Sequence, residues 1–194
     1  MSNARSETQV AIMEATYEAL AEHGYADLTI QAIADAFPKS KSLLYYHYET
    51  KDAILTDFLS YLLDLFFEEV TLDDEAPPVE AIQSFIEQLL APELTEEERS
   101  LWVALIELRT RAAHNDAYRE RFDALDAGVI DALAAIIERG IESGEFRDVD
   151  AHREAEFLID TINGAVIRRV TTDDTVAATA REALDDYIDR VLVA

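Results

Sequence analysis

Apolar residues recur at intervals of three and four along most of the chain, which is the spacing that places side chains on one face of an α-helix. The first such run predicts a helix that stops at Gly24. Ser6 and Gln9 stand three residues apart before this run, the spacing of a capping box, in which each side chain bonds the backbone N–H of the other residue. We therefore expect the first helix to begin directly after Ser6.

Two short helices are predicted next. Thr29 is a good N-cap for the first of them, and Pro38 ends it because proline cannot continue a helix. Ser40 can cap the second, which extends to about Tyr46. Two short helices joined by a tight turn and preceded by a longer helix are typical of the helix-turn-helix arrangement, which places its second short helix in the DNA major groove.

Longer helices fill the rest of the chain. Residues 51–70 carry an apolar stripe, and at about 1.5 Å per residue this helix is roughly 30 Å long. The acidic segment 71–78 predicts a loop, and the pair Thr95 and Glu98 has capping-box spacing before another helix. The remaining periodic segments predict helices over residues 79–90, 116–143, 150–170 and 175–193. The pattern predicts an all-α protein of about nine helices, without a strand.

The charge of the chain argues at first against nucleic acid as a partner. The formal net charge is −25 and the pI is near 4.2, whereas phosphate binding favours a basic surface. The distribution is uneven, however, because residues 1–55 hold 8 acids and 4 bases while residues 56–194 hold 33 acids and 12 bases. The chain's lysines, Lys39, Lys41 and Lys51, all fall in the first segment, although a solvated turn can also gather three lysines by chance.

The acid excess is spread through the chain, as in proteins of organisms that accumulate molar salt. At 1 M salt the Debye length is about 3 Å, so repulsion between surface carboxylates nearly vanishes. The alternatives are an acidic interaction surface and partial disorder. The hydrophobic content of 49% and its helical periodicity favour a packed protein over a disordered one.

Several classes of function lack the residues they need. The chain has no cysteine, and none of its four histidines stands three residues after a glutamate, so the di-iron bundle motif is absent. Paired-histidine zinc motifs, glycine-flanked serine nucleophiles and glycine-rich phosphate loops are absent from the sequence as well. We expect no enzyme activity, no metal and no cofactor. The polar N-terminus and the short apolar runs predict no signal sequence and no membrane span, and therefore a cytoplasmic protein.

The stretch from Thr29 to Leu55 resembles the signature of the tetracycline-repressor (TetR) family without a gap. Its most diagnostic pieces are Ile33-Ala34, the run from Leu44 to Tyr48, and Lys51. The resemblance extends from residue 9 to residue 55, and the number and lengths of the later helices agree with it. It implies a DNA-binding domain over residues 1–50 and an effector-binding and dimerisation domain over residues 51–194.

The resemblance also implies which side chains contact operator DNA. Leu44 and Tyr48 look like core positions, while phenol, imidazole and ammonium groups around them donate to phosphates or reach base edges. The implied contacts are Thr29, Gln31, Ser40, Lys41, Ser42, Leu43, Tyr45, Tyr46, His47 and Lys51. The alternative is that the aromatic members only pack. Pro38-Lys39 and Ser42-Leu43 stand where the family commonly has Gly-Val and Gly-Thr, so base specificity cannot be copied from relatives.

Two further sets follow from the later helices. Aromatic and polar residues of the middle helices either line an effector cavity or fill a core, and the candidates for the cavity are Phe58, Tyr61, Leu62, Trp102, Ile106, Arg109, Phe122, Phe157 and Asn163. The last two helices resemble the family's pair that meets a second subunit across a two-fold axis. The implied dimer contacts are Gly164, Ile167, Leu184, Tyr187, Ile188 and Val191, and the alternative is a purely intramolecular core.

The sequence therefore predicts a homodimeric transcriptional regulator, a repressor that a small effector releases from a palindromic DNA operator. The alternative is a helical protein-interaction module that does not bind DNA, which the acidic balance favours. Tyr45, His47 and Lys51 argue against that alternative because they retain the family's DNA-contacting residue types.

Overall fold

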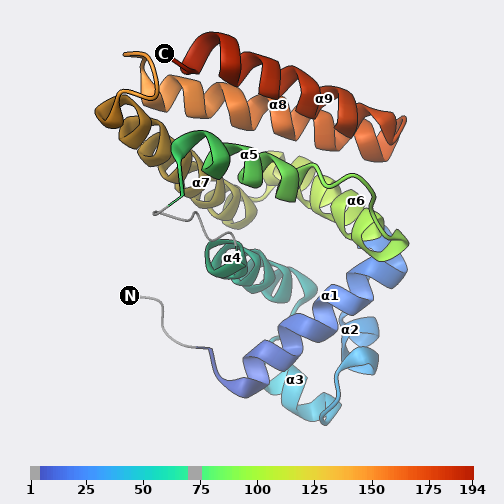
Figure 1. Cartoon of the computed structure of the whole chain (residues 1–194). Helices are drawn as coiled ribbons and strands as arrows, with labels where there is room; N and C mark the ends of the chain where they lie inside the picture. Colours follow the sequence, from blue (N-terminus) through green and yellow to red (C-terminus); the bar gives the residue numbers. More distant parts are fainter. Residues whose placement is uncertain (1–4, 70–75) are drawn as a thin grey trace. The chain divides into compact units, whose positions relative to one another are not determined.

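The computed structural model describes residues 5–69 and 76–194. Within these ranges it is all-α, as predicted, with an isolated antiparallel bridge between Phe146 and Val193 (Figure 1). The elements are α1 (Glu7–Asp27), α2 (Ile30–Ala36), α3 (Lys41–His47), α4 (Lys51–Glu69), α5 (Pro78–Leu89), α6 (Glu96–Arg111), the 3-10 turn η1 (Ala112–His114), α7 (Asp116–Ser143), α8 (Ala151–Thr171), α9 (Thr175–Tyr187) and the π turn η2 (Ile188–Leu192). None of the described helices is long and apolar enough to cross a membrane.

The predicted caps begin the helices. Ser6 Oγ accepts from Gln9 N at 3.3 Å while Gln9 Oε1 accepts from Ser6 N at 3.0 Å, so the capping box of α1 is complete. Thr95 and Glu98 form the same box at α6, with Thr95 N donating to Glu98 Oε2 at 2.7 Å. These bonds satisfy N–H groups that have no partner within the helix. Ser40 is at the N-cap position of α3, but its hydroxyl makes no capping bond.

The helix ends agree with the sequence in most places. Gly24 has φ of 65° and interrupts α1 where the first helix was predicted to stop, and Gly144, at φ 78°, follows α7. Such positive φ values are strained for any residue with a Cβ. The last helix differs from its prediction, because α9 ends at Tyr187 and continues as the π turn before Val193 pairs with Phe146. The predicted loop 71–78 falls mostly outside the described residues.

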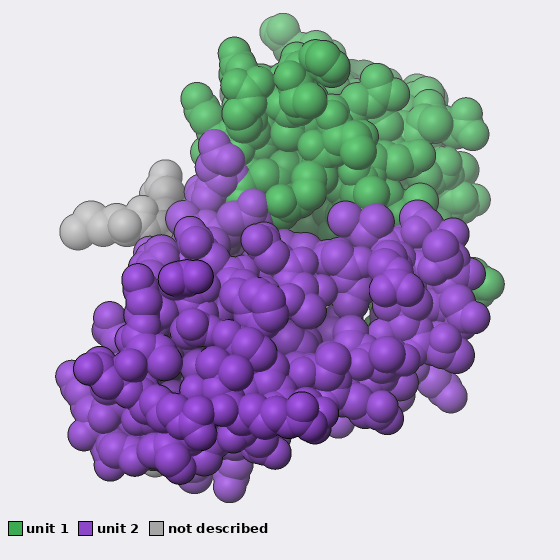
Figure 2. All heavy atoms as spheres, turned by 90° about the horizontal axis from the view of Figure 1, so that it is seen from above, with its two compact units in different colours: residues 1–66, 95–122 green, residues 67–94, 123–194 purple. Residues whose placement is uncertain are grey.

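The chain forms two compact units, coloured green and purple in Figure 2. Unit 1 contains residues 1–66 and 95–122, and unit 2 contains residues 67–94 and 123–194. The helix-turn-helix segment therefore shares unit 1 with α6, η1 and the beginning of α7. These units are defined by compactness and not by function, so the functional boundary predicted between residues 50 and 51 stays a prediction.

The core of unit 1 forms where α6 lies along α1 and where α1 covers α2. Unit 1 has fully buried side chains on α1, α2, α3, α4 and α6, among them Ile12, Leu20, Ile33, Leu44, Phe58 and Leu108. Burying each such side chain contributes about 1.5–3 kcal/mol to folding. The short helices α2 and α3 thus owe their stability to packing rather than to their length.

Tyr25, in the last turn of α1, is held from three sides within unit 1. Its backbone N–H donates to Glu107 of α6 at 3.2 Å, and its ring lies 4.5 Å from Lys51 Nζ and 5.3 Å from the guanidinium of Arg111. Nearby, the hydroxyl of the buried Tyr118 donates to Asp52 at 2.9 Å. Burial is the main cause that raises the pKa of Tyr118 well above its usual range, and this hydrogen bond adds to it. These contacts join α1 to α4 and α6, and they join α4 to the start of α7.

Unit 2 is built on α8 and α9, which lie side by side and which α5 covers. Arg169 of α8 is 2% exposed and donates to the carbonyls of Ala91 at 2.6 Å and Pro92 at 3.3 Å. Its Nε lies 3.5 Å from a carboxylate oxygen of Asp174 in the turn between α8 and α9. A buried guanidinium needs such acceptors because an unpaired charge in a protein interior is strongly unfavourable.

The end of α7 closes unit 2 around a glycine. Gly140 O accepts from the N–H groups of Glu145 and Phe146, which folds the chain back so that the buried Phe146 ring lies over Gly140. A Cβ added at Gly140 would lie 2.2 Å from the ring, far inside van der Waals contact. The position therefore requires a residue without a side chain.

We expect Gly140→Ala to lower the free energy of unfolding by about 1–3 kcal/mol, because the new methyl group forces the ring out of its site. Thermal and urea unfolding followed by circular dichroism measure the change. In a Phe146→Ala background the same substitution should become neutral or stabilising, by up to about 1 kcal/mol, because alanine is the better helix former. A loss of equal size in both backgrounds would show that the ring is not the cause.

Candidate nucleic-acid interface

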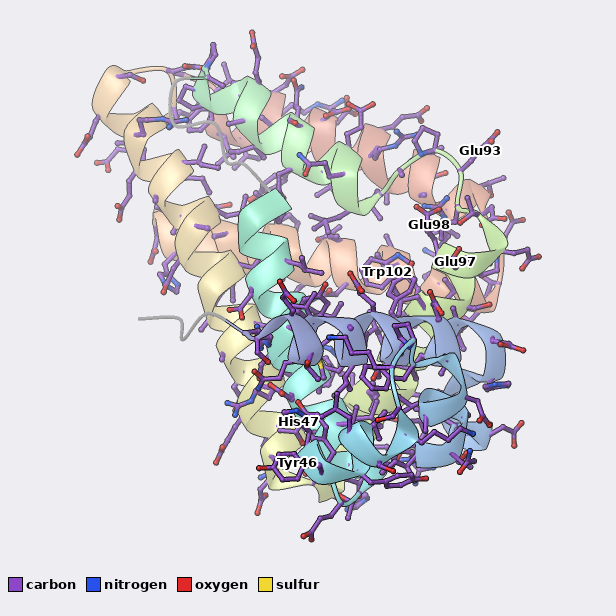
Figure 3. All side chains as sticks on the ribbon, turned by 90° about the horizontal axis from the view of Figure 1, so that it is seen from below. Tyr46, His47, Glu93, Glu97, Glu98 and Trp102 are labelled. Atoms are coloured by element: carbon purple, nitrogen blue, oxygen red, sulfur yellow. The ribbon has the colours of Figure 1, made fainter. Side chains whose placement is uncertain are left out.

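Helix α3 presents two opposite faces. Leu44 is fully buried, whereas Tyr45 and Tyr46 on the following positions are 42% and 83% exposed. His47 is exposed as well, and its ring meets that of Tyr46 edge-on at 5.5 Å between centroids (Figure 3). Adjacent exposed aromatic side chains form the kind of surface patch that often marks an interaction site. One turn of helix thus anchors α3 and offers aromatic and imidazole groups to the outside.

A polar network links α2 to α3. Tyr45 Oη donates to Gln31 Oε1 at 3.2 Å, and Gln31 Nε2 donates to Asp35 Oδ1 at 3.0 Å. The same Asp35 oxygen pairs with Lys41 Nζ. Three predicted DNA contacts, Gln31, Lys41 and Tyr45, are therefore joined through one carboxylate that the sequence analysis did not select.

Some of the other predicted contacts are free on the surface, and others are already hydrogen-bonded within the chain. Ser40 and Ser42 are exposed and Leu43 is half-buried. The hydroxyl of Thr29 caps α2 by accepting from Ala32 N at 3.0 Å. Lys51 Nζ donates to the carbonyl of Leu28 at 3.0 Å and lies 3.4 Å from that of Tyr25. An ammonium has three hydrogens, so a phosphate would take up the one that remains.

Tyr48 extends the anchoring of α3. It is half-buried, and its hydroxyl donates to Asp57 of α4. Burial, followed by this hydrogen bond, raises the pKa of Tyr48 well above its usual range, so the phenol stays neutral and donating. The predicted core role of Tyr48 thus includes a polar bond from the C-cap of α3 to α4.

The predicted effector residues fall into both units. In unit 1, Phe58 and Phe122 are buried, while Tyr61, Leu62, Trp102, Ile106 and Arg109 are half-buried. In unit 2, Asn163 is half-buried and Phe157 is 45% exposed, stacked on Tyr187 at 4.5 Å between centroids. Two of the unit 1 rings carry cations, with the guanidinium of Arg109 4.6 Å from Phe122 and that of Arg5 5.5 Å from Tyr61.

A hollow of about 310 Å³ lies on unit 1 between α1 and α6. It contains none of the predicted effector residues and is lined by Glu18, Ala21, Glu22, Glu96, Glu97 and Ser100. Glu97, with Glu98 beside it, lies at the start of α6 (Figure 3). No group of three or more acids or histidines in the described parts of the chain is arranged to hold a metal ion.

The predicted dimer contacts lie on α8, α9 and the π turn. Gly164 and Ile167 are exposed on α8, and Tyr187 and Val191 are half-buried. The Tyr187 hydroxyl donates a hydrogen bond to Glu154. Burial, the larger cause, and this hydrogen bond together raise the pKa of Tyr187 to about 12. Leu184 and Ile188 are 1% and 0% exposed inside the chain's own core, so they leave no surface for a partner.

Three residues that organise these sites were missed in the sequence. Asp35 is four residues after Gln31, a spacing that brings side chains together on a helix, and this was the available signal. Tyr25 and Arg169 gave no such signal, because their partners lie more than 70 residues away at Glu107 and Ala91.

Family models match most of the chain. The model described as "Bacterial regulatory proteins, tetR family" matches residues 12–57, which include α2 and α3. The model described as "BetI-type transcriptional repressor, C-terminal" matches residues 78–193. Together they cover the predicted helix-turn-helix and nearly all of the later helices.

Solved structures and curated relatives agree with these matches. A TetR transcription regulator from Haloarcula marismortui is 41% identical, with 97% of this chain and 100% of that chain covered and a TM-score of 0.87. A structure from Saccharomonospora viridis in complex with choline is 27% identical, covering 98% and 100%, with a TM-score of 0.82. The HTH-type transcriptional repressor AcnR of Corynebacterium glutamicum is 22% identical over 193 residues, 98% of this chain and 91% of that protein. The chain therefore belongs to the tetR family of DNA-binding transcriptional regulators.

Proposed function

We propose that this regulator is a cytoplasmic homodimer that represses transcription by binding a palindromic operator, and that a small effector releases it. The observation that carries the DNA-binding part is α3, which buries Leu44 while exposing Tyr45, Tyr46 and His47 beside Lys41. Repression is supported by AcnR, which is named a repressor, and by the BetI-type match of the later helices.

The contacts at the operator divide into two kinds. Lys41, Leu43 and Tyr46 face base edges, where an ammonium donates to guanine and apolar atoms meet the thymine methyl group. Tyr45, His47 and the free hydrogen of Lys51 fix the register on phosphates, with Thr29, Gln31, Ser40 and Ser42 approaching the backbone. Contacts of the first kind are short-range, so they persist in molar salt where counterion release no longer drives binding.

The effector belongs to the class of small organic cations. The related structure from Saccharomonospora viridis holds choline. In unit 1 the rings of Phe122 and Tyr61 already accept guanidinium groups, and Trp102, the best ring type for such contacts, is half-buried on α6. The net charge of −25 also favours a cation over an anion.

The homodimer uses the face of α8 that carries Gly164 and Ile167, with Tyr187 and Val191 beside it. Ile167 and Phe157 are large apolar side chains that are 42% and 45% exposed on this helix, which a partner would cover. Gly164 leaves room for the close approach of a second helix, because nothing lies within 4 Å of its missing Cβ in the single chain.

We expect Tyr46→Ala and Lys41→Ala each to weaken binding to a duplex enriched from a random pool by wild-type protein. A lost base contact costs about 1–3 kcal/mol, which corresponds to roughly 5- to 150-fold in the dissociation constant. Fluorescence anisotropy measures the affinity, and circular dichroism confirms that each variant is folded. Tyr46→Phe keeps the ring and should retain most of the affinity. Failure of wild-type protein to enrich any duplex would support a protein-interaction module instead.

The salt dependence of the same complex distinguishes short-range from long-range binding. A protein that makes 6–10 phosphate contacts loses roughly 10³–10⁵ in affinity between 50 and 200 mM salt. We expect this acidic protein to lose far less, or to gain affinity, from low to molar KCl, because salt screens the repulsion between its carboxylates and DNA. A steep fall while the dimer stays folded would contradict the proposed contacts.

Gly164→Leu should weaken dimerisation at least tenfold and leave the fold of the single chain intact. Within one chain the new side chain meets nothing at its Cβ, so a loss of association reports on the partner helix. Analytical ultracentrifugation in molar KCl measures the monomer–dimer equilibrium. Glu18→Leu is the control, because it adds the same side chain to an exposed position of α1, a helix outside the proposed interface. Wild-type protein that sediments as a 21.8 kDa monomer at micromolar concentration would exclude the dimer.

Choline should raise the unfolding temperature and lower operator affinity. A ligand at 100 times its dissociation constant stabilises the folded state by about 2.7 kcal/mol. Ethanolamine, which carries a strongly hydrated primary ammonium, should bind more weakly, and Trp102→Leu should reduce the choline effect. Stabilisation by a fatty acid but not by any organic cation would identify a different effector class.

A further inference from the structure

Asp35 is an anion on the surface that faces DNA. It lies on α2, exposed, and its Oδ1 accepts from Gln31 Nε2 at 3.0 Å and pairs with Lys41 Nζ at the start of α3. Gln31 in turn accepts from the Tyr45 hydroxyl at 3.2 Å. A carboxylate beside three DNA contacts repels phosphate, so its presence there calls for a compensating role.

We propose that Asp35 is a positioning residue for specificity, which directs Lys41 toward base edges and away from phosphates. This inference rests on the proposed DNA contacts of Lys41 and Gln31. The Asp35–Lys41 pair is electrically neutral, so Lys41 releases no counterion and adds little to sequence-independent binding. A phosphate that approaches Lys41 also approaches Asp35 and is repelled.

The Asp35–Lys41 pair acts differently on a guanine edge than on a phosphate. The O6 and N7 acceptors of guanine carry no net charge, so the carboxylate does not repel them. The ammonium of Lys41 has three hydrogens, and it can donate to guanine while it keeps its bond to Asp35. The carboxylate thus disfavours the non-specific complex more than the specific one, and the ratio of the two affinities rises.

Asp35 also orients the second contact. The Gln31 amide can turn over, but here its Nε2 faces the carboxylate and its Oε1 faces the Tyr45 hydroxyl. An acceptor at Asp35 therefore fixes which end of the amide points toward Tyr45. The carboxylate aligns α2 and α3 side chains for one arrangement of DNA.

The test compares Asp35→Asn with wild type on two probes, a random-sequence duplex pool and the duplex that wild-type protein enriches from it. Asp35→Asn should bind the random pool about two- to fivefold more tightly at low salt, the range expected for releasing one exposed ion pair. The slope of log affinity against log salt for the pool should steepen by about 0.9, the value of one new phosphate contact. Affinity for the enriched duplex should rise less, so specificity falls.

Two further variants separate this role from a change of net charge. Asp27→Asn removes the same charge from an exposed position at the end of α1, and it should alter affinity for both probes equally. In a Lys41→Ala background, Asp35→Asn should do no more than Asp27→Asn, because no ammonium remains to be released. A pool-specific gain that appears only when Lys41 is present supports the proposal.

The inference is wrong if Asp35→Asn behaves like Asp27→Asn, or if its gain persists without Lys41. In those cases wild-type protein still enriches a duplex and the proposed function stands. If wild-type protein enriches no duplex at all, the proposed function and this inference fail together. Circular dichroism of each variant excludes unfolding as the cause of any change.

Discussion

The packing of α6 along α1 is the constraint on which unit 1 depends. The two short helices α2 and α3 are each 7 residues long, well below the length at which an isolated helix is stable in water. Helix α2 is held because it packs against α1, and α3 packs in turn against α2. Helix α1 is itself held by α6 and by the contacts of Glu107, Lys51 and Arg111 with Tyr25. Any displacement of α6 therefore acts on the helix that supports the DNA-binding surface.

The chain just before α6 is fixed by a different device. Arg169 is buried in unit 2, and it donates to the carbonyls of Ala91 and Pro92, a few residues before the cap at Thr95. Removing one partner of a buried charge typically costs about 3–5 kcal/mol, so these acceptors are not easily given up. Helix α6 thus continues from a segment anchored by α8 and ends beside Tyr25 of α1.

Local rules located most of the fold because they act within a few residues. The capping boxes at Ser6 and Thr95, and the stops at Gly24 and Gly144, all rest on bonds or backbone angles between near neighbours. The family resemblance of residues 29–55 placed α3 in the same way. The stripe on the last helix was harder to interpret, because period alone does not tell whether Leu184 and Ile188 face their own chain or a partner.

The contacts that organise the candidate site could not be obtained from the sequence. Lys51 was assigned to phosphate by resemblance, and its ammonium also binds the carbonyls of Tyr25 in the last turn of α1 and of Leu28 just after it, more than 20 residues away. The number of possible partners at such separations is too large for spacing rules to choose among them. Asp35 is the intermediate case, since its bond to Gln31 follows helical spacing while its pair with Lys41 depends on how α2 meets α3.

The distribution of charge connects these details to the proposed regulation. A protein of net charge −25 cannot approach DNA through long-range attraction, and at 1 M salt the Debye length of about 3 Å also removes the long-range repulsion. What remains is direct contact, and α3 is suited to it, because its seven residues contain no acid and expose two tyrosines. Asp35 then has little effect on the overall field in molar salt but still acts on Lys41, its immediate neighbour. In molar salt, DNA recognition depends on the groups in direct contact with DNA. The Asp35 carboxylate, which contacts Lys41, therefore affects DNA binding more than the other forty acids of the chain.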